Sequence, residues 1–122
     1  MTDPSAPWPT ELRVAKDRKS LAIAFNSGEA HELSAEYLRV CSPSAEVKGH
    51  APSQKKTVPG KRNVEIIKIE PVGNYAVRIH FDDMHNSGIY SWTYFLQLGR
   101  NPDNHWGVYL AELEAKGLSR DR

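Results

Sequence analysis

Apolar and polar side chains alternate over residues 11–33. The apolar members recur at every second position within each run and are expected to share one face of a sheet: Leu12, Val14, Leu21, Ile23, Phe25 and Leu33. A polar turn at residues 17–19 and a second turn at residues 26–28 reverse the chain, and Gly28 can supply the positive φ that such a turn needs. The pattern predicts a three-stranded meander.

A second alternating stretch runs from Val64 to Phe81 and predicts a hairpin. Residues 64–70 and 75–81 form its two strands, and residues 71–74 are typical of a tight turn. The adjacent Ile66 and Ile67 break the alternation, which indicates a bulge or burial on both faces. The second strand is expected to present Tyr75, Val77, Ile79 and Phe81 on one face and Arg78, His80 and Asp82 on the other.

Three helical segments are expected between and after these strands. Ser34 is suited to cap a short helix that ends at Pro43, a helical turn is expected over residues 91–96, and Pro102 opens a last helix that ends near Gly117. The apolar stripe of the last helix is expected to consist of Trp106, Leu110 and Leu113. We therefore predict an α+β fold, a small antiparallel sheet of two hairpin units with short helices and a C-terminal helix.

The composition narrows the classes of function. The chain has 122 residues, and its 16 basic and 15 acidic residues leave a net charge of +1, which by itself favours no nucleic-acid binding. The single cysteine, Cys41, excludes an internal disulfide and suits a reducing compartment. No apolar run reaches the roughly 18 residues of a membrane helix, and residues 1–10 have no signal-peptide pattern, so we expect a cytoplasmic protein.

Two segments hold more polar chemistry than their predicted structure requires. Residues 37–50 lead from the first helix into a connection that continues to Arg62 without a convincing strand or helix. The connection is basic, which suits an acidic partner, but it lacks the interleaved aromatic side chains that favour nucleic acid. Residues 81–92 form the second segment, and Arg39 is expected to clamp an acid such as Glu46 or Asp82.

Several short motifs in these segments carry a resemblance to a known family. They are Leu38-Arg39, residues 42–46, Gly49-His50, residues 72–76 and residues 81–92. In these motifs the chain resembles the gamma-butyrobetaine hydroxylase-like N-terminal domain family, over roughly residues 12–99. The resemblance implies a domain at residues 11–99, preceded by a mobile Pro-rich tail at residues 1–10 and followed by a C-terminal helical extension at residues 100–122.

The resemblance also implies a position for a structural zinc site. In the hydroxylases that this domain resembles, a Cys-x-Cys-x-x-Cys run follows the Leu-Arg pair, and a later histidine completes the site. Those positions in this chain are Ser42, Ser44, Val47 and His85. Because a hydroxyl or a valine side chain cannot replace a thiolate as a zinc ligand, we expect the zinc site to be degenerate and no metal to bind.

A weak iron or zinc site is the alternative, with His80, Asp82, Asp83 and His85 as its ligands. His80 and Asp82 have the His-x-Asp spacing of a non-haem iron facial triad, and His85 or His105 is a conceivable third ligand. In the hydroxylases that the chain resembles, however, iron and 2-oxoglutarate bind in a separate and larger C-terminal barrel. We therefore favour a structural arrangement of Asp82 and His85 around Arg39.

No set of catalytic residues is recognisable, so we expect no enzymatic activity. In other proteins the domain that this chain resembles is fused to the oxygenase barrel or to an Mrp-type P-loop ATPase of iron–sulfur cluster handling. The resemblance therefore implies an accessory or protein-interaction domain of iron–sulfur or iron-enzyme metabolism, with an Mrp-type ATPase as the first expected partner; self-association through the C-terminal helix stays open. The side chains expected to contact the partner are Arg39, Ser42, Ser44, Glu46, His50, Lys55, Lys56, Tyr90 and Trp92.

Overall fold

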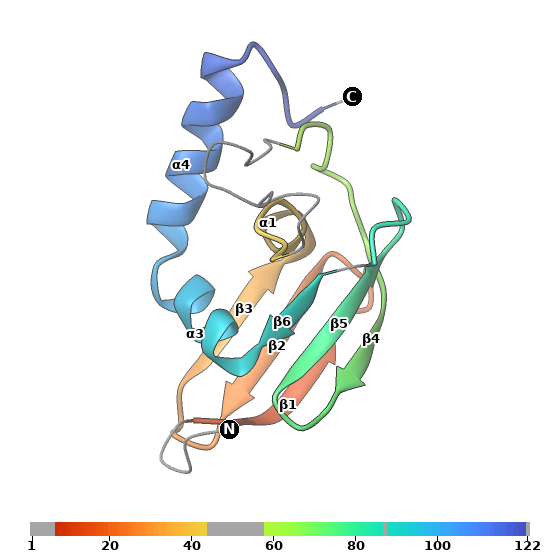
Figure 1. Ribbon diagram of the computed structural model, residues 1–122, viewed down its shortest axis with the longest axis vertical. Helices are drawn as coiled ribbons and strands as arrows, with labels where there is room; N and C mark the ends of the chain where they lie inside the picture. The colour runs from red at the N-terminus through yellow and green to blue at the C-terminus, as the bar shows by residue number, and fades with distance from the viewer. Residues whose placement is uncertain (1–6, 44–57, 87, 122) are drawn as a thin grey trace.

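The computed structural model describes residues 7–43, 58–86 and 88–121. Two antiparallel three-stranded sheets make up its lower half in Figure 1. The first sheet contains β1 (Pro9–Val14), β2 (Ser20–Phe25) and β3 (Ala30–Ser34), and the second contains β4 (Ile66–Val72), β5 (Ala76–Phe81) and β6 (Ile89–Ser91). The helices are α1 (Ala35–Val40), α3 (Trp92–Arg100) and α4 (Pro102–Ala115). The predicted α+β class is confirmed.

The first sheet is the predicted meander, in the order β1-β2-β3. Its turn between β2 and β3 contains Gly28 with a φ of +92°, the left-handed conformation for which glycine is favoured. The sheet begins earlier than expected, because β1 starts at Pro9, within the segment interpreted as a tail. The side-chain oxygen of Asn26 accepts a hydrogen bond of 2.9 Å from the backbone N–H of Trp8, which attaches the start of β1 to the β2–β3 turn.

The second sheet contains the bulge indicated by the two adjacent isoleucines. The pairing of β4 with β5 shifts register between Ile66 and Lys68. Arg18, in the β1–β2 turn, donates to the carbonyl oxygens of Ile66 and Ile67 at 3.3 and 2.8 Å, and its own carbonyl accepts from Ile66 at 2.8 Å. The bulge therefore supplies the backbone groups that connect the two sheets. One predicted position was wrong: Tyr75 is 49% exposed, because it precedes β5 and belongs to the turn.

The two short helices begin in the same way. The hydroxyl of Ser34 accepts a hydrogen bond of 3.0 Å from the backbone of Tyr37, and the hydroxyl of Ser91 accepts one of 3.1 Å from Tyr94. A serine in extended conformation thus ends a strand and caps the following helix in both sheets. The second helix, α3, continues to Arg100 and is longer than the helical turn expected over residues 91–96.

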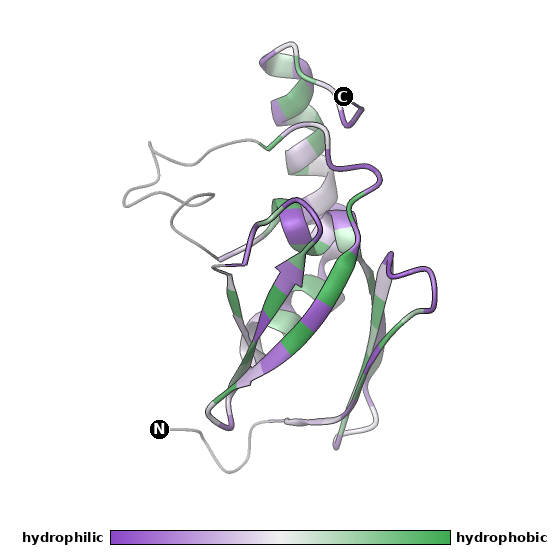
Figure 2. Ribbon diagram, turned by 90° about the vertical axis from the view of Figure 1, so that its right-hand side faces the viewer, coloured by the Kyte–Doolittle hydropathy of each residue, from purple (hydrophilic) through white to green (hydrophobic). Residues whose placement is uncertain are grey.

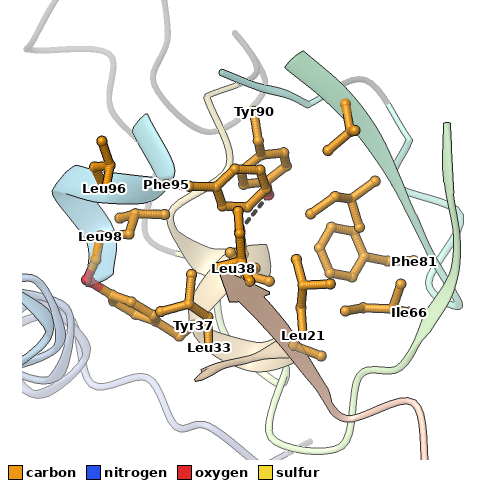
Figure 3. Packing of buried hydrophobic residues seen from close by; sticks show 14 of the residues in the cluster. Leu21, Leu33, Tyr37, Leu38, Ile66, Phe81, Tyr90, Phe95, Leu96 and Leu98 are labelled. Carbon is orange, nitrogen blue, oxygen red and sulfur yellow. Dashed lines mark hydrogen bonds between the residues drawn. The ribbon is translucent and has the colours of Figure 1, made fainter. Parts of the chain in front are cut away.

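The main core lies between the inner faces of the two sheets and is closed at one end by α1 and α3 (Figure 3). Alternation along the strands, visible as changing colours in Figure 2, directs one set of side chains into it. Its fully buried members include Leu21, Ile23, Leu38, Ile66, Ile79 and Phe95. Two tyrosines within this core have hydroxyls that donate to backbone carbonyls, Tyr37 to Leu98 and Tyr90 to Leu38. Their hydrogen bonds connect α1 to α3 and β6.

The last helix, α4, packs on α1 through a second, smaller cluster made by Val40, Tyr109 and Leu113. Trp106 adds an edge-on contact with Tyr37, with ring centroids 6.2 Å apart. The predicted stripe was wrong at one position, since Leu110 is 40% exposed and Tyr109 is buried in its place. The side chains of α4 that face α1 are therefore those at positions 106, 109 and 113, each about one helical turn after the one before. No helix in the described part of the chain is long and apolar enough to span a membrane.

Candidate functional site

The turn between β5 and β6 organises the candidate site, and it projects at the right-hand edge of Figure 1. The backbone N–H of Phe81 donates to the carbonyl of His85 at 3.0 Å, and that of Met84 donates back to Phe81 at 3.2 Å. One carboxylate oxygen of Asp83 accepts from the His85 backbone at 3.1 Å. Met84 has a φ of +73°, rare for a residue with a side chain, and this conformation directs an 87% exposed side chain outward.

A buried carboxylate holds this turn against the rest of the domain. The other oxygen of Asp83 lies 2.8 Å from Arg39 Nε and 2.6 Å from Lys61 Nζ, and the Asp83 side chain is only 6% exposed. Arg39 comes from α1, and Lys61 comes from the segment that leads to β4. We call these three side chains the Asp83 cluster; it joins three distant parts of the chain through charge-assisted contacts.

Among the described residues, Arg39 contacts Asp83, and the prediction of Asp82 was wrong. Asp82 follows β5 with its side chain on the outer face, where its carboxylate accepts a hydrogen bond of 3.0 Å from the backbone of Glu65. The backbone of Asp82 donates in return to the Glu65 carbonyl at 2.9 Å. Both acids lie in the turn that follows β5, and the turn directs Asp83 toward Arg39 of α1. Glu46, the other acid proposed for the clamp, lies outside the described residues.

The environment of Asp83 stabilises its charged form. Burial alone raises the pKa of this carboxyl, but hydrogen bonds from Lys61, Arg39 and the His85 backbone outweigh burial and lower the pKa to about 2 from its usual 3.8. The carboxylate therefore stays ionised at every physiological pH. A permanently charged, buried acid with two basic partners is suited to positioning and unsuited to proton transfer near neutral pH.

Two of the positions that the hydroxylase resemblance assigns to zinc ligands touch each other. The hydroxyl of Ser42 lies 2.9 Å from Nε2 of His85, and both side chains are buried. Gly88 closes over this pair, since a Cβ atom there would lie 2.4 Å from the Ser42 hydroxyl. The remaining two positions, Ser44 and Val47, lie outside the described residues.

The four ligands proposed for the alternative metal site do not come together. His80, on the outer face of β5, lies 3.1 Å from a carboxylate oxygen of Glu70, and this hydrogen bond lowers the pKa of Glu70. Asp82, Asp83 and His85 have the separate partners given above. The described residues contain no group of three or more histidine, cysteine, aspartate or glutamate side chains placed to hold a metal ion. His105, the other conceivable ligand, lies on α4 beside Tyr37.

The two aromatic residues expected to contact a partner differ in exposure. Tyr90 is fully buried, and burial raises the pKa of its hydroxyl, which stays protonated and donates to Leu38. Trp92 is half-buried, stacks near Phe95 and donates from Nε1 to the Asn74 carbonyl at 3.0 Å. Arg39 and Ser42 are also buried. The remaining residues predicted to bind a partner lie outside the described part of the chain: Ser44, Glu46, His50, Lys55 and Lys56.

Sequence reasoning missed Lys61 and Met84. Lys61 belongs to a basic connection, and nothing in its spacing distinguishes the lysine that pairs with Asp83 from its neighbours. Met84 follows two acids in a predicted turn, and an apolar residue at a turn tip was a signal that could have been used. The structure also contains a cavity of about 340 Å³ below this turn, lined by residues 60–64, Asp82, Asp83, Arg120 and Asp121.

Comparisons with known proteins agree with this architecture. The model of the family described as gamma-butyrobetaine hydroxylase-like, N-terminal, matches residues 12–96. Two similar NMR solution structures are 41% and 45% identical to the chain; they cover 94% and 98% of it and 90% of their own chains, with TM-scores of 0.79 and 0.81. No curated protein matches the chain.

A third similar structure is a crystal structure of a protein of unknown function from Acidithiobacillus ferrooxidans, which belongs to the DUF971 family. It is 34% identical, covers 80% of this chain and 98% of its own, and has a TM-score of 0.65. The resemblance predicted from the motifs is thereby confirmed at the level of the family.

The low pKa of Asp83 predicts a specific pH dependence of stability. Replacement of Asp83 by Asn should lower the free energy of unfolding at pH 7 by about 3 kcal/mol, because the buried Arg39 and the partly buried Lys61 lose their anionic partner. The folded-state pKa is depressed, so the contribution of the carboxylate is complete above the unfolded pKa near 4 and is lost as the pH falls toward 2. Urea unfolding of both proteins should therefore show a difference that shrinks between pH 4 and pH 2. Asp121→Asn, in an exposed pair, should change stability by less than about 1 kcal/mol.

The close approach at Gly88 predicts a second effect. Gly88→Ala should displace the Ser42 hydroxyl from His85 and destabilise the domain, because the added methyl group would overlap a buried atom. The His85 ring signals in NMR spectra should shift, and thermal unfolding should occur at lower temperature. Gly107→Ala is the matched control: it has open space on exposed helix and should stabilise by up to about 1 kcal/mol. Unchanged His85 signals in a fully stable Gly88→Ala protein would refute the role of the contact.

Proposed function

The chain belongs to the gamma-butyrobetaine hydroxylase-like, N-terminal family, and we propose that it is a non-enzymatic accessory domain that binds a protein of iron–sulfur or iron-enzyme metabolism in the cytoplasm. One observation carries this proposal. Charged and polar side chains of the family-like motifs contact one another, and these contacts fix the shape of the projecting β5–β6 turn. The zinc position that the resemblance implies is occupied by a Ser42–His85 contact, which supports a degenerate site.

The exposed surface around the turn has the character of a contact site. Met84 stands at its tip on a backbone that the Asp83 cluster and two turn hydrogen bonds hold in place. A methionine side chain adapts to an apolar pocket on a partner, and a fixed backbone lowers the entropy lost on binding. Ile89, in β6, is the next exposed apolar side chain along the chain. Arg39, Ser42 and Tyr90 then act by supporting this surface from below.

An Mrp-type P-loop ATPase is the proposed partner. In other proteins a domain of this family is fused to such an ATPase, and a separate copy of the domain would use the same contact between two chains. Lys55 and Lys56, in the basic connection, would steer an acidic surface of the partner, which affects mainly the rate of association. The apolar contact made by Met84 would affect mainly the rate of dissociation.

Titration of the labelled protein with the purified Mrp-type ATPase of the same cell tests this proposal. Met84→Asn should weaken binding by about tenfold or more through faster dissociation, because it removes an apolar side chain that the partner would bury, while asparagine tolerates the left-handed backbone. The double variant Lys55→Glu/Lys56→Glu should slow association, and added salt should reduce the difference from the original protein.

Leu110→Ala is the matched control, since it truncates an exposed apolar side chain on α4, far along the chain from the turn. It should bind as the original protein does. The proposal fails if no complex with the ATPase forms, or if Met84→Asn and Leu110→Ala bind with equal affinity.

A further inference from the structure

Residues 118–121, which follow α4, lie against the segment that carries Lys61; in Figure 1 the blue coil after α4 comes close to the yellow-green coil that leads to β4. The backbone N–H of Gly60 donates to the carbonyl of Ser119 at 2.9 Å, and that of Arg62 donates to the carbonyl of Arg120 at 3.1 Å. Two main-chain hydrogen bonds therefore join residues 119 and 120 to residues 60 and 62.

One side chain of this end segment, that of Arg120, contacts Glu36 and Trp106, and we call these two residues the Glu36 pocket. The guanidinium of Arg120 contacts both carboxylate oxygens of Glu36, at 2.7 and 2.6 Å, and lies 5.1 Å from the ring centroid of Trp106. Glu36 is at the first turn of α1, and its side chain is only 7% exposed. The planar guanidinium of an arginine can bind both carboxylate oxygens of Glu36 and also lie against the Trp106 ring. The ammonium group of a lysine cannot make both contacts equally well.

A second charged contact lies at the rim of the same groove. Arg62 contacts both oxygens of the Asp121 carboxylate, at 2.5 and 3.2 Å, and both side chains are largely exposed. Backbone pairing, the Glu36 pocket and the Arg62 contact together recognise an extended segment in which an arginine is followed by an acid. The chain supplies that sequence itself, at residues 120 and 121.

The end segment is attached in a way that permits it to leave. Gly117 connects it to α4 with a φ of +65° and open space around its Cα, and Leu118 remains 39% exposed. Neither hydrophobic cluster includes a residue of the segment. Its departure would open the cavity of about 340 Å³, whose wall contains Arg120 and Asp121, and would take from the buried Glu36 carboxylate its partner. The site therefore favours a replacement arginine over an empty state.

We propose that residues 60–62, Glu36 and Trp106 form a docking groove for an extended, arginine-bearing segment of another protein, and that residues 118–121 cover this groove within the chain. This site lies apart from Met84 and stands independently of the ATPase proposed above. The cover acts as a tethered competitor. The apparent affinity for the partner segment is therefore proportional to the fraction of molecules whose groove is open, and it is low when most grooves are covered. A second copy is the less suitable occupant, because a four-residue arm spans at most about 14 Å.

Fluorescence anisotropy with a labelled synthetic peptide of residues 116–121 tests the groove in the full-length protein. Arg120→Ala empties the Glu36 pocket and should bind the peptide at least about tenfold more tightly than the original protein. Asp121→Arg loosens the cover without altering the pocket and should act in the same direction. A peptide with alanine in place of its arginine should bind to neither variant.

Two further variants locate the binding. Glu36→Gln added to Arg120→Ala should abolish binding of the peptide, because the pocket loses its charge. Arg100→Ala removes a comparable two-oxygen contact, with Glu29, outside the groove and should behave as the original protein. The proposal is wrong if Arg120→Ala and Asp121→Arg both fail to bind the peptide, if the arginine and alanine peptides bind equally, or if either variant becomes dimeric by sedimentation, which would identify a second copy as the occupant.

Discussion

A single buried carboxylate, that of Asp83, connects the parts of the chain on which the candidate site depends. It takes its two basic partners from α1 and from the segment that enters β4, while its second oxygen fixes the backbone of the β5–β6 turn. Removing the Asp83 carboxylate would take this partner from the buried Arg39, which costs far more than breaking an exposed pair. The turn, the start of β4 and the end of α1 are therefore expected to keep one relative position.

In this arrangement the residues that support the surface are buried and differ from the residues that are exposed on it. Arg39, Ser42 and Tyr90 lie beneath the turn, where their hydrogen bonds hold α1 against β6 and the turn. The exposed surface of the turn includes Met84, the most exposed among the large apolar residues described. Polar residues that mark a family can thus support an interaction without touching the partner.

The fold was largely predictable, because strand alternation, turn residues and serine caps are local signals; the bulge at Ile66 and the cap at Ser34 are examples. The site was less predictable, because it depends on which of several similar side chains meet in space. Strand alternation already places Asp82 on the outer face, but it does not predict where the following turn directs Asp83, so the partner of Arg39 was not predicted. Likewise, packing against α1 rotates α4 so that Tyr109 is buried instead of Leu110.

The organisation of the site depends most directly on the energetic coupling between Arg39 and Asp83. A double-mutant cycle with Arg39→Met, Asp83→Asn and the double variant, each unfolded in urea at pH 7, measures that coupling apart from the other consequences of each change. If the buried pair organises the site, the two single changes should be coupled by at least about 1 kcal/mol. If the two single changes in the free energy of unfolding add to the value of the double variant within about 0.5 kcal/mol, the pair is not coupled. That result would contradict an organising role of the Arg39–Asp83 pair.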